Sequence, residues 1–526
     1  MRNDGAVEYA VENRATWREW AGLATLALPT LMIGVDMTVL HLAVPRLSAD
    51  LQPSSTQLLW IVDIYGFLIA GFLLTMGTLG DRIGRRRLLM IGATAFALAS
   101  IFAAFSTSAE MLIVARALLG VAGATLMPST LSLIRNMFHH AGQRTFAVSV
   151  WMMCILTGQA LGPLTGGILL EYFWWGSAFL IAVPVMILML VLAPFFLPEY
   201  RDPNPGRLDL ISAGMSLITI LGVVYALKQL ARYGISGEVF LALGIGFGVG
   251  YLFIRRQRTL TSPMLDLELF KRPAFSAVVA THALSMFMLA GMQFLTAQHF
   301  QLVLGLSPIN AGMWMVPAAI GGMIGALLAA AFLRVMLPVN AIVTNLLVGV
   351  IGFGIITMVD LSSGLALLVT GLIFATFSVS LVTALTTDLI IAAVPGERAG
   401  TASGISETSA EFGIAMGIAT LGSIGTAVYR QQLSGSLPAE VSAAVSESSI
   451  ETLGTAVATA EQLPTALGDP LLESARDAFT MGMTVNAVIG AVALAALALL
   501  CYRTLQPTRR AEPGHVSRPV KPAMDD

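Results

Sequence analysis

The chain has 526 residues, of which 56% are hydrophobic and only 11% charged, with a mean hydropathy of +0.80. This composition lies outside the range of soluble globular domains and indicates an integral membrane protein. The net charge of -2 says little about nucleic acid, because the basic residues lie between the apolar runs rather than on one patch, and we expect no nucleic-acid partner. Two cysteines, Cys154 and Cys501, support neither a disulfide framework nor a cysteine metal site.

An α-helix needs about 20 apolar residues to cross a bilayer. By this criterion the sequence predicts fourteen spans, separated by short polar or Gly/Pro-marked breaks. They are centred near residues 33, 68, 98, 122, 156, 187, 219, 247, 286, 320, 348, 373, 414 and 491. The first apolar run is too long for a signal peptide and has no small-residue cleavage site, so we expect nothing to be removed.

Lys and Arg residues are distributed unevenly among the predicted loops. With the N-terminus in the cytoplasm, all but six of the 29 fall on the cytoplasmic side. Arg116 lies within a span, and the other five, counted as external, are Arg46, Lys228, Arg232, Arg430 and Arg476. The positive-inside rule therefore places both termini, residues 1–19 and 504–526, in the cytoplasm.

Two polar cytoplasmic linkers, residues 198–209 and 255–273, bracket spans 7 and 8. The predicted architecture is an all-α membrane protein with an N-terminal six-helix bundle (20–200), a linker with two extra helices (201–272) and a C-terminal six-helix bundle (273–503). One long external loop, residues 430–477, carries Ser, Ala and Glu at helical intervals. We predict a hairpin of two short amphipathic helices there, although the composition fits an unstructured loop about as well.

A glycine- and arginine-rich turn, GTLGDRIGRRRLL at residues 77–89, lies between spans 2 and 3. Its glycines permit a tight turn, its aspartate can cap a helix and its arginines hold the turn on the cytoplasmic side. A basic loop serving topology alone explains the arginines but not the Gly and Asp spacing. The turn resembles the signature of the major facilitator superfamily, which implies a gating role for Gly77, Asp81, Arg82, Gly84, Arg85 and Arg86.

Two further segments carry the same resemblance. LIVARALLGVAGA (112–124) resembles the superfamily's fourth-span motif with its intramembrane arginine, Arg116. GQALGPLTGG (158–167) resembles the fifth-span motif associated with antiporters, with Gly158, Gly162, Pro163, Gly166 and Gly167. Small residues at four-residue steps let a neighbouring helix approach closely, so plain helix packing explains these glycines too. The direction of transport therefore rests on the resemblance.

Three more segments, VDMTVLHLAVPRL (35–47), LLWIVDIYGF (58–67) and TASGISETSAEFG (401–413), are similar to fourteen-span drug/proton antiporters. The resemblance covers essentially the whole chain. It implies a proton-coupled multidrug efflux transporter in the bacterial cytoplasmic (inner) membrane, working by alternating access on lipophilic cations such as quaternary ammonium compounds, dyes and biguanides. The proton gradient would drive it without a cofactor, and we expect a monomer in contact with membrane lipids.

Three ionisable residues lie at a similar predicted depth. Counting about 1.5 Å per residue from the span ends places Asp36, Asp63 and Arg116 in the outer half of the membrane. An ion at the bilayer centre costs about 2.5–3.5 kcal/mol even on the lenient insertion scale, so all three should face the protein interior. Two carboxylates against one guanidinium leave one negative charge that can hold or release a proton. A purely structural role, in which Asp36 only neutralises Arg116, is the alternative.

Span 13 carries Glu407 and Glu411, four residues apart and therefore on one helix face. Like charges on adjacent turns cannot both ionise cheaply in a low dielectric, so one should stay protonated until a cation arrives. An exchanger needs a carboxylate that holds either substrate or proton. We therefore predict Glu407 and Glu411 as the principal site, with Asp36 and Asp63 as an outer relay.

Ring faces and a flexible thioether would suit a lipophilic cation. The candidates for a cavity wall are Trp60, Tyr65, Phe179, Trp314, Phe377 and Met292, each of which is individually more often a lipid-facing or core residue. The main alternative function is a same-fold proton-coupled exporter of an endogenous metabolite, lipid precursor or antibiotic. Scattered histidines and the lack of a phosphate-binding loop predict neither an enzyme nor a metal site.

Overall fold

The structure is a computed structural model that describes residues 14–201, 209–260, 267–360, 364–393, 399–436 and 443–505. In this part of the chain, fourteen helices are long and apolar enough to cross a membrane, which confirms the predicted number of spans. Each predicted centre falls inside one of them. The runs fold as helices because a bilayer offers no water to backbone N–H and C=O groups, which a helix pairs internally.

The N-terminal six spans are formed by seven helices. They are α1 (Trp17–Leu51), α2 (Ser55–Ile83), α3 (Arg85–Ala104), α4 (Ala109–Met137), α5 (Ala141–Tyr172) and, as the sixth span, the short α6 (Ser177–Leu180) followed by α7 (Ala182–Phe196). Serine hydroxyls cap two of these helices: Ser54 accepts from the backbone N–H of Gln57, and Ser108 from that of Met111. Such caps satisfy helix-terminal donors and fix where each span begins.

Two extra helices, α8 (Leu210–Tyr233) and α9 (Gly237–Gln257), precede the C-terminal bundle. Gly234 ends α8 with a φ of +74°, a conformation that favours glycine. The C-terminal elements are η1 (Leu269–Lys271), α10 (Pro273–Gln298) continued by the π-helical turn η2 (His299–Val303), α11 (Pro308–Val335), α12 (Pro338–Ile356), α13 (Gly364–Ala392), α14 (Ala399–Ser436) and α17 (Thr465–Thr504). The fold is thus two six-helix bundles with two additional helices between them in the sequence.

Two short helices, α15 (Ala443–Ser449) and α16 (Leu453–Ala460), lie between α14 and α17. Because α14 continues to Ser436 and α17 begins at Thr465, the connection is shorter than the predicted loop of residues 430–477. α16 buries the apolar side chains of Leu453 and Ala456, as an amphipathic helix does. Its N-terminus is closed by a capping box between Thr452 and Thr455.

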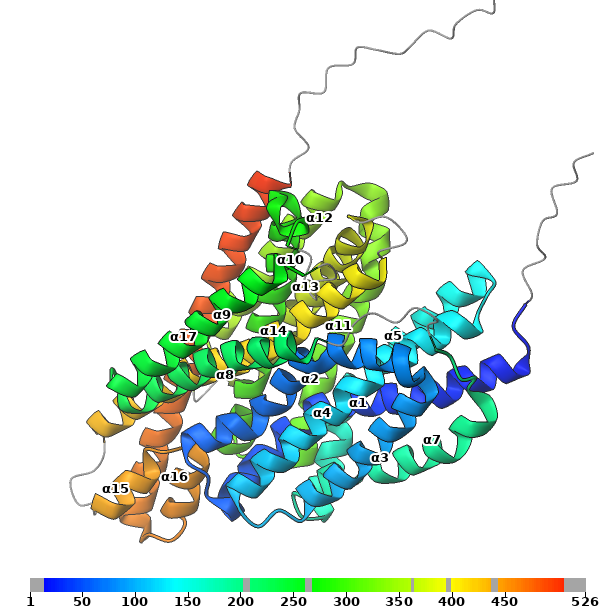
Figure 1. The fold of residues 1–526 in the computed structure, drawn as a ribbon. Helices are drawn as coiled ribbons and strands as arrows, with labels where there is room; N and C mark the ends of the chain where they lie inside the picture. The colour runs from blue at the N-terminus through cyan, green and yellow to red at the C-terminus, as the bar shows by residue number, and fades with distance from the viewer. Residues whose placement is uncertain are drawn as a thin grey trace, which may run out of the picture.

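The two bundles meet at one end and point apart at the other (Figure 1). We call the end that carries α15 and α16 the hairpin end, and the opposite end, where α1 begins and α17 ends, the termini end. Near the hairpin end, Gln301 of η2 donates to the carbonyl oxygen of Leu42 in α1 at 3.0 Å. The rings of His41 in α1 and Phe294 in α10 lie 6.0 Å apart. The bundles are therefore closed on each other at the hairpin end.

α8 lies beside both α2 and α14, as Figure 1 also shows. Val224 of α8 packs in one cluster with Phe67 of α2 and with Ala415 and Ala419 of α14. Phe67, Val224 and Ala419 are fully buried there. This extra helix therefore covers the seam between the two bundles on the α2/α14 side.

The glycines of α5 face two different partners. A Cβ at Gly158, Gly162 or Gly166 would meet α1, so this face of α5 packs closely on its own bundle. A Cβ at Gly167 would instead lie 2.7 Å from the carbonyl oxygen of Pro308 in α11, in the other bundle. The spacing of small residues thus produces the close helix approach expected from the sequence.

Candidate cation and proton site

Arg116 of α4 is held in the interior by several partners. Its Nη1 donates to Oδ2 of Asp36 in α1 at 3.0 Å, and its Nε donates to the carbonyl oxygen of Ile61 at 3.2 Å. The guanidinium carbon lies 4.3 Å from the ring centroid of Tyr65 and 5.8 Å from that of Phe179. Both charged side chains are buried, so the pair is compensated locally.

Asp63 of α2 has a partner that the sequence did not predict. The ammonium of Lys228 in α8 lies 2.8 Å from Asp63 Oδ2, and both side chains are fully buried. The same ammonium lies 4.0 Å from the ring centroid of Trp60. The expectation that one of the two aspartates keeps an unbalanced charge is therefore wrong, because a second cation is present.

Lys228 was counted as an external loop residue, and the structure corrects this placement. The apolar run that starts at Leu210 is followed by lysine after about the 20 residues that a span needs, so its end can be placed on either side of Lys228. The signal that resolves the ambiguity is Gly234, which ends the helix more than one turn later. Lys228 consequently lies inside α8 rather than beyond it.

Glu407 and Glu411 lie one turn apart on α14. Glu411 is buried and its Oε2 has no hydrogen-bond partner among the described residues. Glu407 is half-buried and close enough to Glu411 for the two charges to interact. Asp36 and Asp63 are both paired to cations, whereas the described residues supply no ion pair to Glu407 or Glu411.

A small cavity brings most of these groups together between the bundles. Asp63, Arg116 and Glu411 all line it, together with His41. The remaining lining residues are Met37, Leu40, Val62, Tyr65, Gly66, Ile414, Ala415 and Ile418. Its volume of about 30 Å³ suits a few water molecules and not a drug-sized ligand, whose pockets span roughly 300–1,000 Å³. A large cation could thus reach Glu411 only after the bundles move apart.

The residues predicted for a cavity wall do not form one surface. Tyr65 lines the cavity and also lies against Arg116, while Trp60 and Phe179 lie against Lys228 and Arg116 respectively. Met292 is fully buried within α10, Phe377 packs against the core and Trp314 on α11 is 42% exposed. The aliphatic lining from α1 and α14, such as Met37 and Ile414, was not predicted, because apolar residues in spans carry no distinguishing signal.

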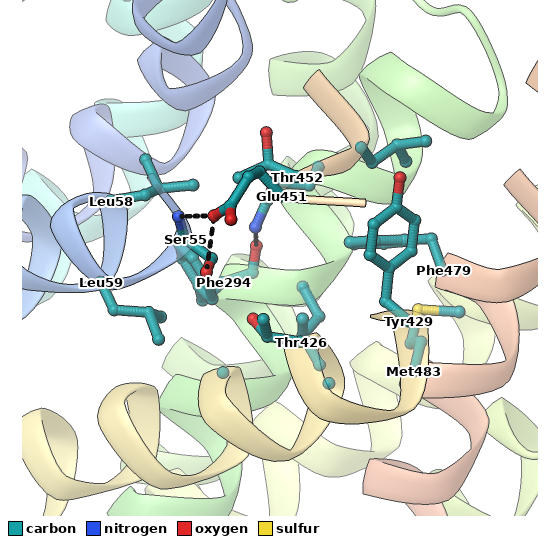
Figure 2. A pocket seen from close by; sticks show the side chains of 15 residues that line it. Ser55, Leu58, Leu59, Phe294, Thr426, Tyr429, Glu451, Thr452, Phe479 and Met483 are labelled. Atoms are coloured by element: carbon teal, nitrogen blue, oxygen red, sulfur yellow. Dashed lines mark hydrogen bonds between the residues drawn. The ribbon is translucent and has the colours of Figure 1, made fainter. Parts of the chain in front are cut away.

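A second cavity, of about 40 Å³, lies at the hairpin end (Figure 2). It is lined by α2, α10, α14, α16 and α17 through residues such as Leu59, Phe294, Tyr429 and Met483. Glu451, two residues before the start of α16, closes one side of it. Its polar lining residues are Ser55, Gln298, Thr426, Tyr429, Glu451 and Thr452.

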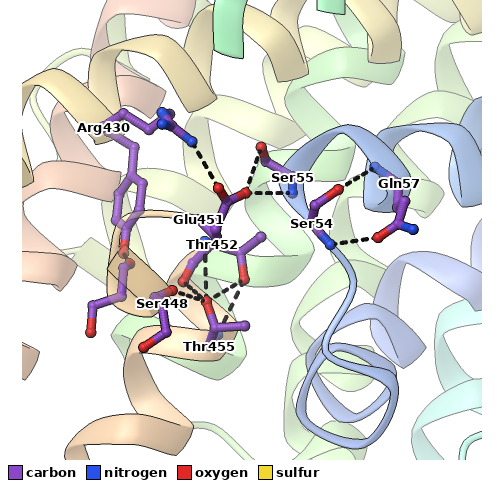
Figure 3. A network of polar contacts seen from close by, with 10 residues as sticks. Ser54, Ser55, Gln57, Arg430, Ser448, Glu451, Thr452 and Thr455 are labelled. Carbon is purple, nitrogen blue, oxygen red and sulfur yellow. Dashed lines mark hydrogen bonds and ion pairs between the residues drawn. The ribbon is translucent and has the colours of Figure 1, made fainter. Parts of the chain in front are cut away.

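Glu451 joins the two bundles through a polar network (Figure 3). Its Oε2 accepts from the backbone N–H of Ser55 at 3.2 Å, at the N-terminus of α2. Its Oε1 lies 3.2 Å from Nη1 of Arg430 in α14. A carboxylate at a helix N-terminus is stabilised by the backbone donors there, so the segment between α15 and α16 bridges both halves of the molecule.

The glycine- and arginine-rich turn between α2 and α3 makes contacts within the N-terminal bundle. Gly84 has a φ of +111°, and a Cβ there would collide with the Glu199 carboxylate. Asp81, near the end of α2, pairs with Arg85, the first residue of α3, and the backbone N–H of Arg86 donates to Glu199 at 3.2 Å. The turn is therefore tied to the segment that follows α7.

Comparison with known proteins agrees with this architecture. The sequence profile of the Major Facilitator Superfamily matches residues 26–418. A solved structure of a bacterial homologue of the human lysosomal transporter Spinster, in an inward-facing and unoccupied conformation, superposes with a TM-score of 0.65. The superposition covers 94% of this chain and 98% of the solved chain, at 17% sequence identity. It shows a likeness of fold.

Several curated proteins are similar over most of the chain. The multidrug efflux pump LfrA of Mycolicibacterium smegmatis is 44% identical over 92% of this chain and 96% of its own length. The methyl viologen resistance protein SmvA of Salmonella typhimurium is 36% identical over 89% of this chain and 94% of its own. The chain is thus a multi-pass membrane transporter rather than an enzyme, and it belongs to the Major Facilitator Superfamily.

Proposed function

We propose that the protein exports lipophilic cations in exchange for protons. The observation that carries this proposal is Glu411, a buried carboxylate with one oxygen that no described residue contacts by a hydrogen bond, on a cavity whose other strong charges stand in ion pairs. Such a group is stabilised either by a proton or by a cation that reaches it. Competition between the two at one carboxylate couples their movement in opposite directions.

The position of the site between the bundles suits alternating access. Glu411 belongs to α14, whereas Asp36, Asp63 and Arg116 belong to α1, α2 and α4 of the other bundle. Rocking of one bundle against the other therefore changes the access of Glu411 to each side of the membrane. The membrane potential contributes about 2.3 kcal/mol per 100 mV for each net charge that enters.

The relatives support drug efflux as the activity. One is described as a multidrug efflux pump and another as a methyl viologen resistance protein, and methyl viologen is an organic cation. The cationic substrate class and the proton as driving ion are part of our proposal. Quaternary ammonium compounds, cationic dyes and biguanides are the substrates we expect.

The proposal is tested with purified protein in liposomes. An imposed proton gradient should drive accumulation of tetraphenylphosphonium on the acidic side, and a protonophore added with valinomycin and equal potassium on both sides should abolish it. An imposed potassium diffusion potential of the same magnitude, without a pH difference, provides the control for passive redistribution of the cation. Correctly folded protein that leaves tetraphenylphosphonium unaffected by the pH gradient would refute the proposed exchange.

One comparison favours a second candidate function, export of a compound that the host makes. The probable actinorhodin transporter of Streptomyces coelicolor is 31% identical over 77% of this chain and 72% of its own length. If this function applied, a deletion strain would retain an endogenous compound and would show unchanged efflux of ethidium. Metabolite profiling and dye efflux in the same strain separate the two candidates.

A further inference from the structure

The proposed exchange at Glu411 assigns no role to the buried ion pair between Lys228 and Asp63. Lys228 comes from α8, one of the two extra helices, and its side chain is fully buried. The ammonium has a carboxylate at 2.8 Å on one side and the ring of Trp60, 4.0 Å from its centroid, on another. A carboxylate and an aromatic face are the two groups that recognise an organic ammonium ion.

This pair has few of the additional bonds that normally accompany a buried structural ion pair. An ammonium has three N–H donors, and Asp63 is the one carboxylate paired with Lys228 in the part of the chain that the structure describes. Asp63 Oδ1 has no hydrogen-bond partner there. Removing two charges from water is costly unless further hydrogen bonds compensate for it, so stability alone accounts poorly for the pair.

The location of Asp63 connects the pair to the substrate site. Asp63 and Glu411 line the same cavity, one from each bundle. The other titratable or charged groups that face it are His41, Tyr65 and Arg116, and Arg116 is already paired with Asp36. If the Lys228 ammonium were absent, the cavity would present two uncompensated carboxylates, Asp63 and Glu411, to an incoming ligand.

We propose that Lys228 is the built-in occupant of a second cation subsite, formed by Asp63 and Trp60, and that it selects against dicationic substrates. A substrate with one charge binds at Glu411 and leaves the Lys228 pair undisturbed. A substrate with two charges also needs Asp63, and must compete with an ammonium that is tethered beside it. This inference rests on the proposed export of cations and names the charge class that the site favours.

The test uses two probes that share one ring system. Methyl viologen carries two charges, and 1-methyl-4-phenylpyridinium carries one on a closely similar biaryl frame. Transport of both by wild type and by Lys228→Met is measured in liposomes under one proton gradient. Methionine keeps the length of the side chain and removes its charge. We expect the ratio of methyl viologen to 1-methyl-4-phenylpyridinium transport to rise about tenfold or more in this variant.

Two further variants serve as matched controls. Lys228→Arg keeps the charge, so its ratio should stay near that of wild type. The double variant Asp63→Asn, Lys228→Met removes the second carboxylate, so its ratio of methyl viologen to 1-methyl-4-phenylpyridinium transport should stay near that of wild type, whatever its absolute rate. A ratio that rises equally in the double variant would assign the effect to space rather than to charge, and would overturn the inference.

The remaining outcomes are also decisive. An unchanged ratio in Lys228→Met, with the monocation still transported, overturns the inference and leaves the proposed function intact. Failure of Lys228→Met to fold, while the double variant folds and transports the monocation, would show that the pair only neutralises charge, and would overturn it as well. If wild type transports neither probe, the proposed function itself fails.

Discussion

Asp36 and Arg116 form a buried ion pair at 3.0 Å between α1 and α4, in the N-terminal bundle. The pair lies next to the cavity that Glu411 enters from the other bundle, because Arg116 is one of its lining residues. The guanidinium is also fixed by the carbonyl oxygen of Ile61 and the ring of Tyr65. This bundle therefore presents an ordered, charge-compensated surface to the acids of α14.

Breaking the pair on one side should destabilise the protein strongly. In Asp36→Asn the buried Arg116 charge loses its carboxylate, which costs about 3–5 kcal/mol for a pair of this kind. Thermal unfolding of the purified protein measures the loss. The double variant Asp36→Asn, Arg116→Gln removes both charges and should recover most of the stability. An unchanged melting temperature in the single variant would contradict a buried, mutually dependent pair.

Close packing of α5 against α1 predicts a contrast between two glycines. A Cβ at Gly158 would overlap the carbonyl oxygen of Leu31 and approach Cα of Gly34 to 3.0 Å, so Gly158→Ala should cost about 1–3 kcal/mol. Gly248 in α9 has no heavy atom within 4 Å of the corresponding position, so Gly248→Ala should be neutral or slightly stabilising. Equal melting temperatures for the two variants would refute the packing argument.

The bridge through Glu451 should influence the closure of the hairpin end. Glu451→Gln removes the charge that holds Arg430 and the N-terminus of α2, a loss of about 1 kcal/mol, or roughly a fivefold change in population. Spin labels at Ala49 and Gln432, both exposed, report the separation of α1 and α14. We expect a larger fraction of long distances in the variant.

The control for this experiment is Ser448→Ala. Ser448 is exposed on α15, near Glu451 but outside its ion pair, and its hydroxyl donates to the carbonyl oxygen of Val445. Its distance distribution should match that of wild type. Identical distributions in Glu451→Gln and wild type would mean that the hairpin end is held closed by other contacts.

Acid should loosen the contact between the N-terminus of α8 and the C-terminal turn of α9, which Asp209 and Arg256 form. Burial raises the pKa of Asp209, but hydrogen bonds from Ser212 and Arg256 outweigh it and hold the pKa below its ordinary value. A carboxylate with a lowered pKa stabilises the folded state fully above its ordinary pKa of about 3.9, and this stabilisation is lost as the pH falls through the lowered value.

Hydrogen exchange of the first turn of α8, corrected for the intrinsic pH dependence, measures this effect. Protection should be constant from pH 7 down to about pH 5 and should decrease at more acidic pH. In Asp209→Asn, protection should be lower throughout and should lose this acid dependence. A wild-type profile indistinguishable from that of the variant would exclude Asp209 as the responsible group.

The number and place of the spans were predictable because a bilayer imposes a minimum apolar length on each one. Depth counting also placed Asp36 and Arg116 at a similar level, and the structure puts them in contact. Lys228 was not predicted inside a span, because a basic residue at the end of an apolar run resembles the start of a loop. Gly234, which ends α8, is the sequence signal that places Lys228 within the helix.

Other features depend on tertiary contacts that no local pattern encodes. Glu451 and Ser55 are 396 positions apart, and their hydrogen bond exists only because the bundles close at the hairpin end. Trp60 and Phe179 have the ring faces expected of a cation site, but these faces are directed to Lys228 and Arg116. The sequence alone does not distinguish an aromatic ring that contacts one of the protein's own cations from a ring that contacts a bound substrate.

The central claim is that substrate and proton compete at Glu411, and proton release on binding tests it most directly. Purified protein in a weakly buffered detergent solution with a pH indicator is mixed with tetraphenylphosphonium, and the same is done with Glu411→Gln and Glu407→Gln. The account predicts acidification in wild type and none in folded Glu411→Gln. Acidification of the same size in Glu411→Gln as in wild type would contradict it.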